Sequence, residues 1–259
     1  MRAVILAAGR GGRLQGAIGD QPKCLARVGH RTLLDRQVAA LRAAGISDIT
    51  VVAGYGLAQV QRTCPPDVDV VVNPDYGTTN SLYSLWLVRE QLRGGFLVMN
   101  CDVLFHPQLL ADLLSSRFAD AVLVSARGDE AEYGDEEMKV CIRRGLVRAM
   151  AKTLRADESD AENVGIARFS AEGAEALIDV MQGIVGTGAV REWLPRAFAA
   201  FSELRPLRAI DTRGYPWIEI DFPEDYWRAC SEVLPAIEAL APPGDAPASL
   251  VAGRTWRHV

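Results

Sequence analysis

The sequence predicts an α/β fold with a mixed, mostly parallel central sheet. In the first hundred residues, short apolar runs alternate with segments of helical periodicity, which is typical of strands joined by helices. The first apolar run, residues 2–8, stops at a cluster of glycines, as a buried strand does when it turns tightly into the next element. Residues 139–152 instead have the pattern of a hairpin around Arg144 and Gly145, which adds antiparallel strands to the sheet.

The elements follow one another along the chain. We expect the strand at 2–8 to be the central one, and a helix at 32–46, where apolar residues recur at helical spacing and Gly45 provides the stop. Further strands are expected at 49–53, 68–72, 96–99, 121–125, 139–142, 147–152, 164–169, 207–210 and 217–221. Further helices are expected at 57–62, 81–92, 171–181, 190–198 and 223–240. We expect one domain over residues 1–240 and a loosely structured C-terminal tail over 241–259, where proline, glycine and alanine accumulate.

Composition excludes several classes of protein. Apolar residues make up 49% and charged residues 24% of the 259 positions, which is ordinary for a globular protein and too apolar for a disordered one. The net charge of −5 gives no sequence-wide basic footprint, so we do not expect nucleic acid as a partner. No uncharged apolar run has spanning length, so we expect no membrane partner and a cytoplasmic location. The five cysteines form no CxxC pair and indicate neither a disulfide framework nor a zinc knuckle.

Lysine is scarce in this chain. Of 28 basic residues, only Lys23, Lys139 and Lys152 are lysine, which indicates that the basic residues of the solvated surface are mostly arginine. Each lysine is therefore a stronger candidate for a specific role than a lysine in an average protein.

The first candidate site is the glycine-rich turn after the first strand. Glycines let backbone N–H groups approach a phosphate chain, and Arg13 and Lys23, which follows Pro22, can add charge-assisted hydrogen bonds. A P-loop is excluded because no Gly-Lys-Ser/Thr follows the glycines, and the dinucleotide fingerprint fails because Leu14 stands where its third glycine belongs. The alternative is a plain strand-to-helix turn with surface arginines.

Residues 6–14, the segment Pro22-Lys23-Cys24-Leu25 and the helical segment ending Ala44-Gly45-Ile46 resemble the opening of the nucleotidyltransferases that activate sugar phosphates and small alcohol phosphates with NTPs. The resemblance implies a Rossmann-like, glycosyltransferase-A-like three-layer sandwich. It also implies that Arg13 meets the outer phosphates and that Lys23 stabilises the transition state. The nucleotide contacts that it implies in this part of the chain are Leu6, Ala8, Gly9 and Gly11. Gly12 replaces the serine or threonine common in this loop, which removes one side-chain contact to phosphate.

The second candidate site is the segment Asn73-Pro74-Asp75-Tyr76 followed by the polar stretch over residues 79–86. Small hydroxyls and an amide at a helix start are good caps, which is the alternative to a functional role. The stretch is similar to the branch of cytidylyltransferases that act on phosphocholine, inositol phosphate and phosphonates, where it lies against the cytidine. That similarity implies nucleoside contacts at Asn80 and Ser81, with Asn100 as a further nucleotide contact.

Two acidic segments are candidates for a metal site. Asp102 follows an apolar strand, at the sheet edge where open α/β sheets place ligands, and its hard oxygens suit Mg²⁺; a turn or cap is the alternative. Over residues 217–221, alternation puts Ile218 and Ile220 on one face and Glu219 and Asp221 on the other. An exposed strand with a polar outer face is the alternative reading. In the family, the closing segment brings a second metal-binding aspartate beside the first, which implies Asp221 with Asp102.

The second half of the chain resembles the acceptor half of phosphonate and phosphocholine members of the family, over residues 136–140 and 162–166. The acceptor-binding candidates are Lys139, Lys152, Glu162, Asn163, Trp217 and Glu219. The acidic stretch over residues 129–137 could attract an ammonium-bearing acceptor, but charge runs are usually solvated. Aromatic residues such as Trp193 could box a quaternary amine, although aromatics in such segments more often belong to the core.

The function that the resemblance implies is a Mg²⁺-dependent cytidylyltransferase that transfers CMP from CTP to a small phosphonate, such as 2-aminoethylphosphonate, and releases pyrophosphate. Phosphocholine or another alcohol phosphate is the alternative acceptor, and a sugar 1-phosphate the next. A homodimer is compatible with the sequence. A non-catalytic regulatory module of the same fold, a glycosyltransferase and a dinucleotide-dependent oxidoreductase are the other classes considered; the last two fit the glycine turn and Pro22-Lys23 poorly.

Overall fold

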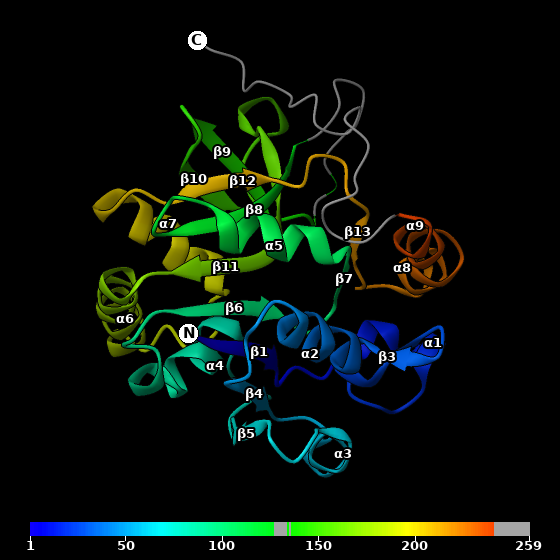
Figure 1. Cartoon of the computed structure of the whole chain (residues 1–259). Coiled ribbons are helices and arrows are strands. Elements are labelled where there is room, and N and C mark those ends of the chain that lie inside the picture. Colours follow the sequence, from blue (N-terminus) through cyan, green and yellow to red (C-terminus); the bar gives the residue numbers. More distant parts are fainter. Residues whose placement is uncertain (127–133, 135, 241–259) are drawn as a thin grey trace.

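The computed structural model describes residues 1–126, 134 and 136–240 (Figure 1). The tail expected over residues 241–259 lies outside the described residues. No helix in the described ranges is long and apolar enough to cross a membrane.

A nine-stranded sheet runs through the middle of the described chain, as Figure 1 shows. Its order is β5 (Asp69–Val72), β4 (Ile49–Ala53), β1 (Arg2–Ala7), β6 (Phe96–Asn100), β11 (Ala161–Phe169), β8 (Ala121–Ala126), β12 (Arg208–Asp211), β10 (Leu146–Ala151) and β9 (Lys139–Arg143). All of these strands run in one direction except β11 and β10, which run against their neighbours. The sheet is therefore mixed and mostly parallel, as predicted.

The first strand lies inside the sheet but not at its centre, which corrects the expectation. β1 is third from the β5 edge, between β4 and β6, with Leu6 opposite Asn100 of β6. The residues after β6 add five further strands on its side, and this displaces the centre of the sheet toward β11. The position still buries β1 on both faces, since Val4 and Ile5 are fully inaccessible.

Helices cover both faces of the sheet and complete three layers. One face carries α4 (Ser81–Leu87), α6 (Ala171–Gly186) and α7 (Leu194–Leu204), which pack around the stacked rings of Phe96 and Phe169. The other face carries α2 (Leu33–Ala43), α3 (Leu57–Thr63) and α5 (Pro107–Ser115). Each helix buries one apolar stripe against the sheet, which is the main source of its stability.

A third, smaller core joins the start of the chain to its end. It packs α1 (Gln15–Ile18), the short pair β2 (Arg27–Val28) and β3 (Arg31–Thr32), and α8 (Pro223–Arg228) and α9 (Leu234–Ala239). The pair β7 (Val103–Phe105) and β13 (Trp217–Glu219) crosses this region, and Ile218 and Ile220 are buried in it. These contacts hold the closing segment of the chain beside the glycine-rich turn.

Several element boundaries differ from the predicted ones for local reasons. The helix expected at 81–92 ends at Leu87 and continues as a 3₁₀ turn over Arg89–Gln91. The helix expected at 190–198 begins at Leu194, because Pro195 fits only the first turn of a helix. α5 and β7 were not predicted. The segment expected to be helical over 223–240 is helical from Pro223 to Ala239, but a π-helical turn at Ala229–Val233 separates α8 from α9.

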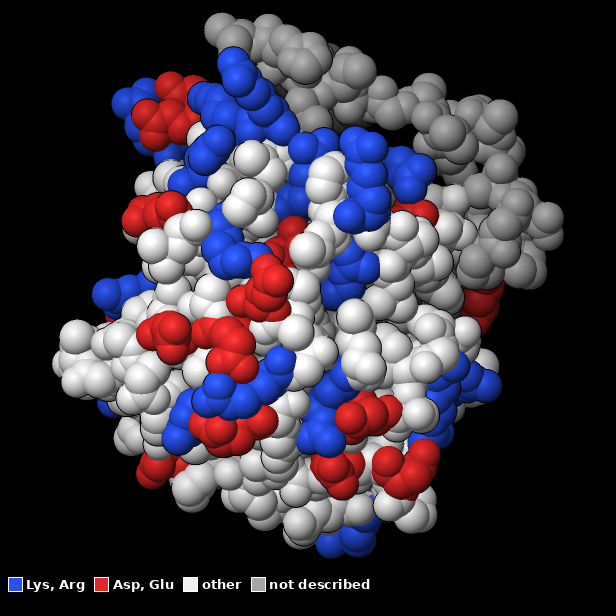
Figure 2. Space-filling model, turned by 60° about the vertical axis from the view of Figure 1, so that its left-hand side comes forward, with Lys and Arg blue, Asp and Glu red and all other residues white. Residues whose placement is uncertain are grey.

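Basic and acidic side chains are interspersed over the face drawn in Figure 2, and the basic ones gather toward its upper end. In Figure 1 that end holds the β9–β10 hairpin, whose arginines at 143, 144 and 148 are exposed.

Candidate active site

One pocket gathers most of the predicted site residues at the carboxyl edge of β1 and β6. Its volume is about 330 Å³, and it is lined by the glycine turn, the start of α4, the end of β6, the segment after β13 and the hairpin side of the sheet. Predicted residues among its lining are Leu6, Ala8, Gly9, Gly11, Arg13, Lys23, Asn80, Ser81, Asn100, Asp102, Lys152, Asn163, Glu219 and Asp221. This is the edge at which open α/β sheets bind ligands.

Two glycines bring the parts of the pocket close together. Gly11 has φ +63°, and a Cβ there would lie 3.1 Å from the Cβ of Lys23. Gly165 of β11 has φ +82°, and a Cβ there would lie 2.7 Å from the amide nitrogen of Asn100. Glycine is favoured at both positions because it tolerates positive φ and leaves room for the facing side chain.

Lys23 is held between the two predicted metal aspartates at the floor of the pocket. Its Nζ lies 2.7 Å from Asp102 Oδ2 and 2.5 Å from Asp221 Oδ1, and the side chain is buried. Burial alone would lower the pKa of Lys23, but the charges of Asp102 and Asp221 outweigh it and raise the pKa above its ordinary value. The lysine is therefore a fixed positive charge, brought from a 3₁₀ turn at Lys23–Leu25 to the ends of two separate strands.

The two aspartates also fit a divalent cation that is completed by substrate oxygens. Asp102 Oδ1 is buried and has no hydrogen-bond partner among the described residues. The second oxygen of Asp221, Oδ2, pairs with Arg13 at 3.3 Å. No group of three His, Cys, Asp or Glu side chains in the described ranges is arranged to hold a metal alone. One or two carboxylates supplemented by phosphate oxygens and water is the arrangement that Mg²⁺ prefers, so the residues present fit this ion.

Glu219 adds a third carboxyl group to the pocket wall. Burial, together with the nearby charges of Asp102 and Asp221, raises the pKa of Glu219 to about 8. Its side chain and that of Asp221 line the pocket while Ile218 and Ile220 are buried, as the alternation along this segment predicts. Glu219 is therefore largely protonated at neutral pH when no cation is bound.

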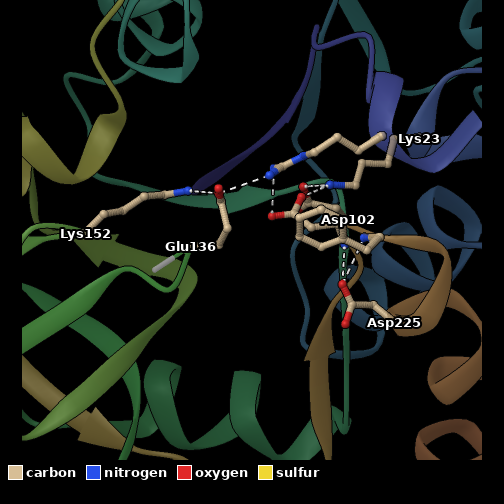
Figure 3. Close-up of polar contacts among 8 residues, drawn as sticks. Lys23, Asp102, Glu136, Lys152 and Asp225 are labelled. Atoms are coloured by element: carbon tan, nitrogen blue, oxygen red, sulfur yellow. Dashed lines mark hydrogen bonds and ion pairs between the residues drawn. The ribbon is translucent and has the colours of Figure 1, made fainter. Parts of the chain in front are cut away.

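A chain of ion pairs crosses from this floor to the hairpin, as Figure 3 shows. Arg13 pairs with Asp221 and also with Glu136, whose Oε2 lies 3.0 Å from the guanidinium. The same oxygen lies 2.8 Å from Lys152 Nζ. Hydrogen bonds from Lys152 and Arg13 lower the pKa of Glu136 below its ordinary value. The ammonium of Lys152 also lies 4.7 Å from the ring centre of Trp193.

The start of α4 forms the other wall, and it is tied to the segment before α7. Asn80 caps the helix through its Oδ1, and its N–H donates to the carbonyl of Val190 at 3.1 Å. The hydroxyl of Ser81 accepts a hydrogen bond from the N–H of Leu194 at 2.8 Å. Both residues also line the pocket, so the structural role of each does not exclude a contact with a ligand.

The pocket lining also contains residues to which the sequence assigned no definite contact with a ligand. They are Gly12, Asn73, Tyr76, Thr79, Ser84, Cys101, Glu136, Met138, Trp193 and Pro195. Asn73 is buried and donates to Thr79 and Ser84, which shapes the wall beside α4. Asn73 stands in the segment offered as the second candidate site, although no contact was assigned to it. Glu136 lay in an acidic stretch that resembles a solvated one.

Three predicted acceptor residues lie outside the pocket lining. Lys139 is buried, and its ammonium donates to the main-chain carbonyl of Lys152 at 2.8 Å, because strand alternation turns it away from the side that Met138 faces. Trp217 packs against the core under α2 and α5. Glu162 of β11 is paired in register with Lys139 and does not line the pocket. The structure thus places these three residues outside the pocket lining, and their contact with an acceptor stays a prediction.

Solved nucleotidyltransferases share this fold. The CTP:phosphocholine cytidylyltransferase of Streptococcus pneumoniae superposes with a TM-score of 0.72 over 88% of this chain and 96% of that one, at 24% identity. The inositol-1-phosphate CTP transferase of T. maritima gives a TM-score of 0.74 over 92% and 96% of the two chains, at 20% identity. These likenesses confirm the predicted Rossmann-like, three-layer architecture.

Similar sequences are cytidylyltransferases with different acceptors. A choline-phosphate cytidylyltransferase of Streptococcus pneumoniae is 34% identical over 46% of this chain and 52% of its own length. A CTP:phosphoglutamine cytidylyltransferase of Campylobacter jejuni is 27% identical over 66% and 73%. A CMP-5'-(3-aminopropyl)phosphonate synthase of Streptomyces rubellomurinus is 35% identical over 48% of this chain and 21% of its own length. The chain thus spans about half or less of two of these relatives.

A family model covers most of the pocket-forming part of the chain. The MobA-like NTP transferase domain matches residues 3–176, from β1 into α6, and so includes the glycine turn, Lys23, Asp102 and Lys152. Asp221 lies beyond the matched residues and is brought to the site by β13. Because this match covers more than half of the chain and the architecture agrees with it, the chain belongs to the MobA-like NTP transferase family.

Proposed function

We propose that this protein is a Mg²⁺-dependent cytidylyltransferase that transfers CMP from CTP to a small phosphonate, such as 2-aminoethylphosphonate, and releases pyrophosphate. The observation that carries the proposal is the position of Lys23 between Asp102 and Asp221, at the floor of a pocket whose rim is a glycine-rich turn with Arg13. A cation fixed between two carboxylates, next to exposed backbone N–H groups, suits a site for a polyphosphate and its metal.

The reaction needs alignment and charge neutralisation more than proton transfer. An oxygen of the acceptor attacks the α-phosphorus of CTP, the new P–O bond forms, and the bond to the β-phosphate oxygen breaks to release pyrophosphate. A phosphate monoester has a second pKa of about 6, so this class of acceptor is largely ionised at neutral pH and requires no general base. This fits a pocket lining that contains Lys, Arg and carboxylates and, among the described residues, no histidine.

Each charged side chain has a defined task in this scheme. Lys23 uses two of its three N–H donors on Asp102 and Asp221, which leaves one for an oxygen of the reacting phosphate. Arg13 neutralises the outgoing pyrophosphate from the glycine turn, and the glycine N–H groups orient the triphosphate. When bound by Asp102 and Asp221, Mg²⁺ would neutralise negative charge on the phosphates and help to orient them.

The acceptor is the finer part of the proposal. The similarity to the phosphonate synthase of Streptomyces rubellomurinus supports a phosphonate as the acceptor, and Lys152 at the pocket wall supplies a cation for its charge. Phosphocholine is the second candidate, because the relative from Streptococcus pneumoniae is named for it and Trp193, which is 47% exposed, offers an aromatic face to a quaternary amine.

The test is pyrophosphate release by the full chain with Mg²⁺, across CTP, UTP, ATP and GTP. Each nucleotide is crossed with 2-aminoethylphosphonate, 2-hydroxyethylphosphonate, phosphocholine and a sugar 1-phosphate. We expect turnover with CTP and a phosphonate. Turnover with CTP and phosphocholine alone would replace the acceptor, and turnover with UTP and a sugar phosphate would replace the branch of the family. No turnover with any pair would favour a non-catalytic module.

A further inference from the structure

We propose that Asp225 is a positioning residue for the reaction. It lies outside the pocket lining, and its carboxylate accepts hydrogen bonds from the main chain of Asp221 and of Phe222. Those two residues contact Lys23 and Arg13, the cations assigned to the reacting and the outgoing phosphates. The inference deepens the proposed function and rests on it for the tasks of the two cations.

A single oxygen of Asp225 fixes the chain where it leaves the site. Asp225 Oδ2 accepts the N–H of Asp221 at 3.1 Å and the N–H of Phe222 at 2.9 Å (Figure 3). Phe222 is the N-cap of α8 and Asp225 is the third residue of that helix, so the carboxylate satisfies N–H groups that have no partner within the helix. The start of α8 is thereby tied to the main chain of the predicted metal ligand Asp221.

The chain that enters the site is fixed by different contacts. β13 pairs with β7, and the N–H of Ile220 donates to the main-chain carbonyl of Asp102 at 3.0 Å. The side chain of Ile220 is buried in the small third core. Asp221 is therefore held on its N-terminal side by a strand pair and a core residue, and on its C-terminal side by the carboxylate of Asp225.

The position of Asp221 affects both cations. Its Oδ1 lies 2.5 Å from Lys23 Nζ, and its Oδ2 lies 3.3 Å from Arg13. Phe222 adds a second contact to Arg13, because the guanidinium lies 4.5 Å from the centre of its ring. Loss of the Asp225 carboxylate would release the main chain of Asp221 and of Phe222 together. A displacement of about 1 Å in groups that orient reacting atoms can cost about 10²-fold in rate.

A purely structural role for Asp225 would be the capping of α8, and α2 provides the comparison. Asp35 is the third residue of α2, and its Oδ2 accepts the N–H of the N-cap Thr32 at 3.2 Å. Both aspartates are half-buried, but Thr32 lies outside the pocket lining whereas Asp221 is part of it. Removal of either carboxylate should destabilise its own helix, and only removal of Asp225 should change the site.

The test compares Asp225→Ala, Asp225→Asn and Asp35→Ala in the full chain. Asparagine keeps an oxygen that can accept both N–H groups, so Asp225→Asn should retain most of the wild-type activity. We expect Asp225→Ala to lower kcat for pyrophosphate release about tenfold, to raise the Mg²⁺ concentration for half-maximal rate about five- to tenfold, and to leave acceptor KM nearly unchanged. Asp35→Ala should change none of these quantities, although its urea midpoint should fall about as far as that of Asp225→Ala.

Two further readouts do not require turnover. Electron paramagnetic resonance of Mn²⁺, used in place of Mg²⁺, should show weaker binding to Asp225→Ala than to wild type or Asp35→Ala. Amide hydrogen exchange over residues 217–226 should be faster in Asp225→Ala than in wild type, because the N–H groups of Asp221 and Phe222 lose their acceptor. Exchange over the same residues should be unchanged in Asp35→Ala.

Equal kcat and equal Mg²⁺ requirement in Asp225→Ala and Asp35→Ala would overturn the proposal and leave Asp225 as a helix cap. An Asp225→Asn enzyme as slow as Asp225→Ala would overturn it as well, because the charge of Asp225 and not its two hydrogen bonds would then matter. If wild type releases no pyrophosphate, while Asp225→Ala alone loses Mn²⁺ affinity and amide protection, the proposed function fails and the positioning of Asp221 stands. Without that loss, both fail.

Discussion

The side of the pocket that we propose for the nucleotide and the side that we propose for the acceptor are built in different ways. On the nucleotide side, main-chain segments do the positioning: a glycine turn after β1, the end of β6 and the capped start of α4. On the acceptor side, half-exposed side chains such as Glu136 and Trp193 lie on connecting segments, joined by ion pairs and a cation–π contact. The first side is held by buried strands, whereas the second side is held by contacts between half-exposed side chains.

This difference predicts which kinetic constant a substitution on each side should change. Groups fixed by the fold next to the reacting phosphate contribute to transition-state stabilisation, so their loss should lower kcat. Groups on the acceptor side contribute mainly to acceptor binding, so their loss should change KM. The predictions below test that division, from the largest expected effect to the smallest.

Lys23→Ala should have the largest effect, because it removes the only lysine among the described residues at the pocket floor and leaves Asp102 and Asp221 facing each other. We expect kcat to fall by about 10²–10³-fold, measured as pyrophosphate release. Arg62→Ala, at an exposed position of α3, is the control and should leave kcat unchanged. A Lys23→Ala enzyme that folds and keeps most of its turnover would break the distinction between the two sides.

Asp102→Asn should come next. It keeps the shape of the side chain but removes the charge of the buried Oδ1, the atom that has no partner within the described chain. We expect kcat to fall about 10–100-fold and more Mg²⁺ to be required for half-maximal rate. The measurement is a Mg²⁺ titration of pyrophosphate release, with Asp69→Asn on the exposed edge strand β5 as the control. An unchanged Mg²⁺ requirement would remove Asp102 from the metal site.

Lys152→Met should weaken acceptor binding, whereas Lys139→Met should lower the stability of the fold. Lys152 faces the pocket, so its loss should raise acceptor KM about five- to tenfold, while kcat and the KM for CTP change little. Lys139 supports the main chain of Lys152 from a buried position, so its loss should lower the free energy of unfolding by about 1–3 kcal/mol. Steady-state kinetics and urea denaturation of both variants give the comparison, and equal effects of the two on KM would contradict it.

The pH dependence of stability should show the state of Glu219. Its pKa is about 8 in the folded protein and 4.5 in the unfolded chain, so the folded state binds more protons between these values. Stability should therefore fall as pH rises from about 5 to 8, by about 1 kcal/mol per pH unit at most. Urea denaturation in EDTA should show this slope in wild type and a shallower one in Glu219→Gln. Glu224→Gln, at an exposed position of α8, should keep the wild-type slope; a wild-type slope in Glu219→Gln would mean that Glu219 is ionised in the apo protein.

The sequence predicted the nucleotide side well, because its signals are local. Apolar runs mark the buried strands, and the glycines and Pro22-Lys23, which lie within the first 25 residues, mark the turn. Alternation over residues 217–221 was enough to place Glu219 and Asp221 on the same side, away from Ile218 and Ile220. Where apolar and polar residues alternate within one segment, the pattern alone predicts which side chains are buried.

The acceptor side was harder to predict because its contacts join elements far apart in the sequence. The local sequence around a hairpin lysine does not show which way its side chain points. Lys152 faces the pocket, whereas Lys139 donates a hydrogen bond to the main chain from a buried position. The register between β9 and β11 decides this, and no local pattern shows that register. The ion pairs of Glu136 were not predicted for the same reason, since its two partners, Arg13 and Lys152, are 123 and 16 residues away along the chain.

The most direct test of the central claim is ³¹P NMR of the complete reaction, with the full chain, CTP, Mg²⁺ and 2-aminoethylphosphonate, beside an identical sample of Lys23→Ala. The proposed chemistry predicts that wild type consumes CTP, releases pyrophosphate and forms a product in which the phosphonate phosphorus and the α-phosphorus of CMP share one bridging oxygen. Lys23→Ala should leave both substrates unchanged over the same time. Absence of the bridged product in wild type with this acceptor and with phosphocholine would contradict the claim.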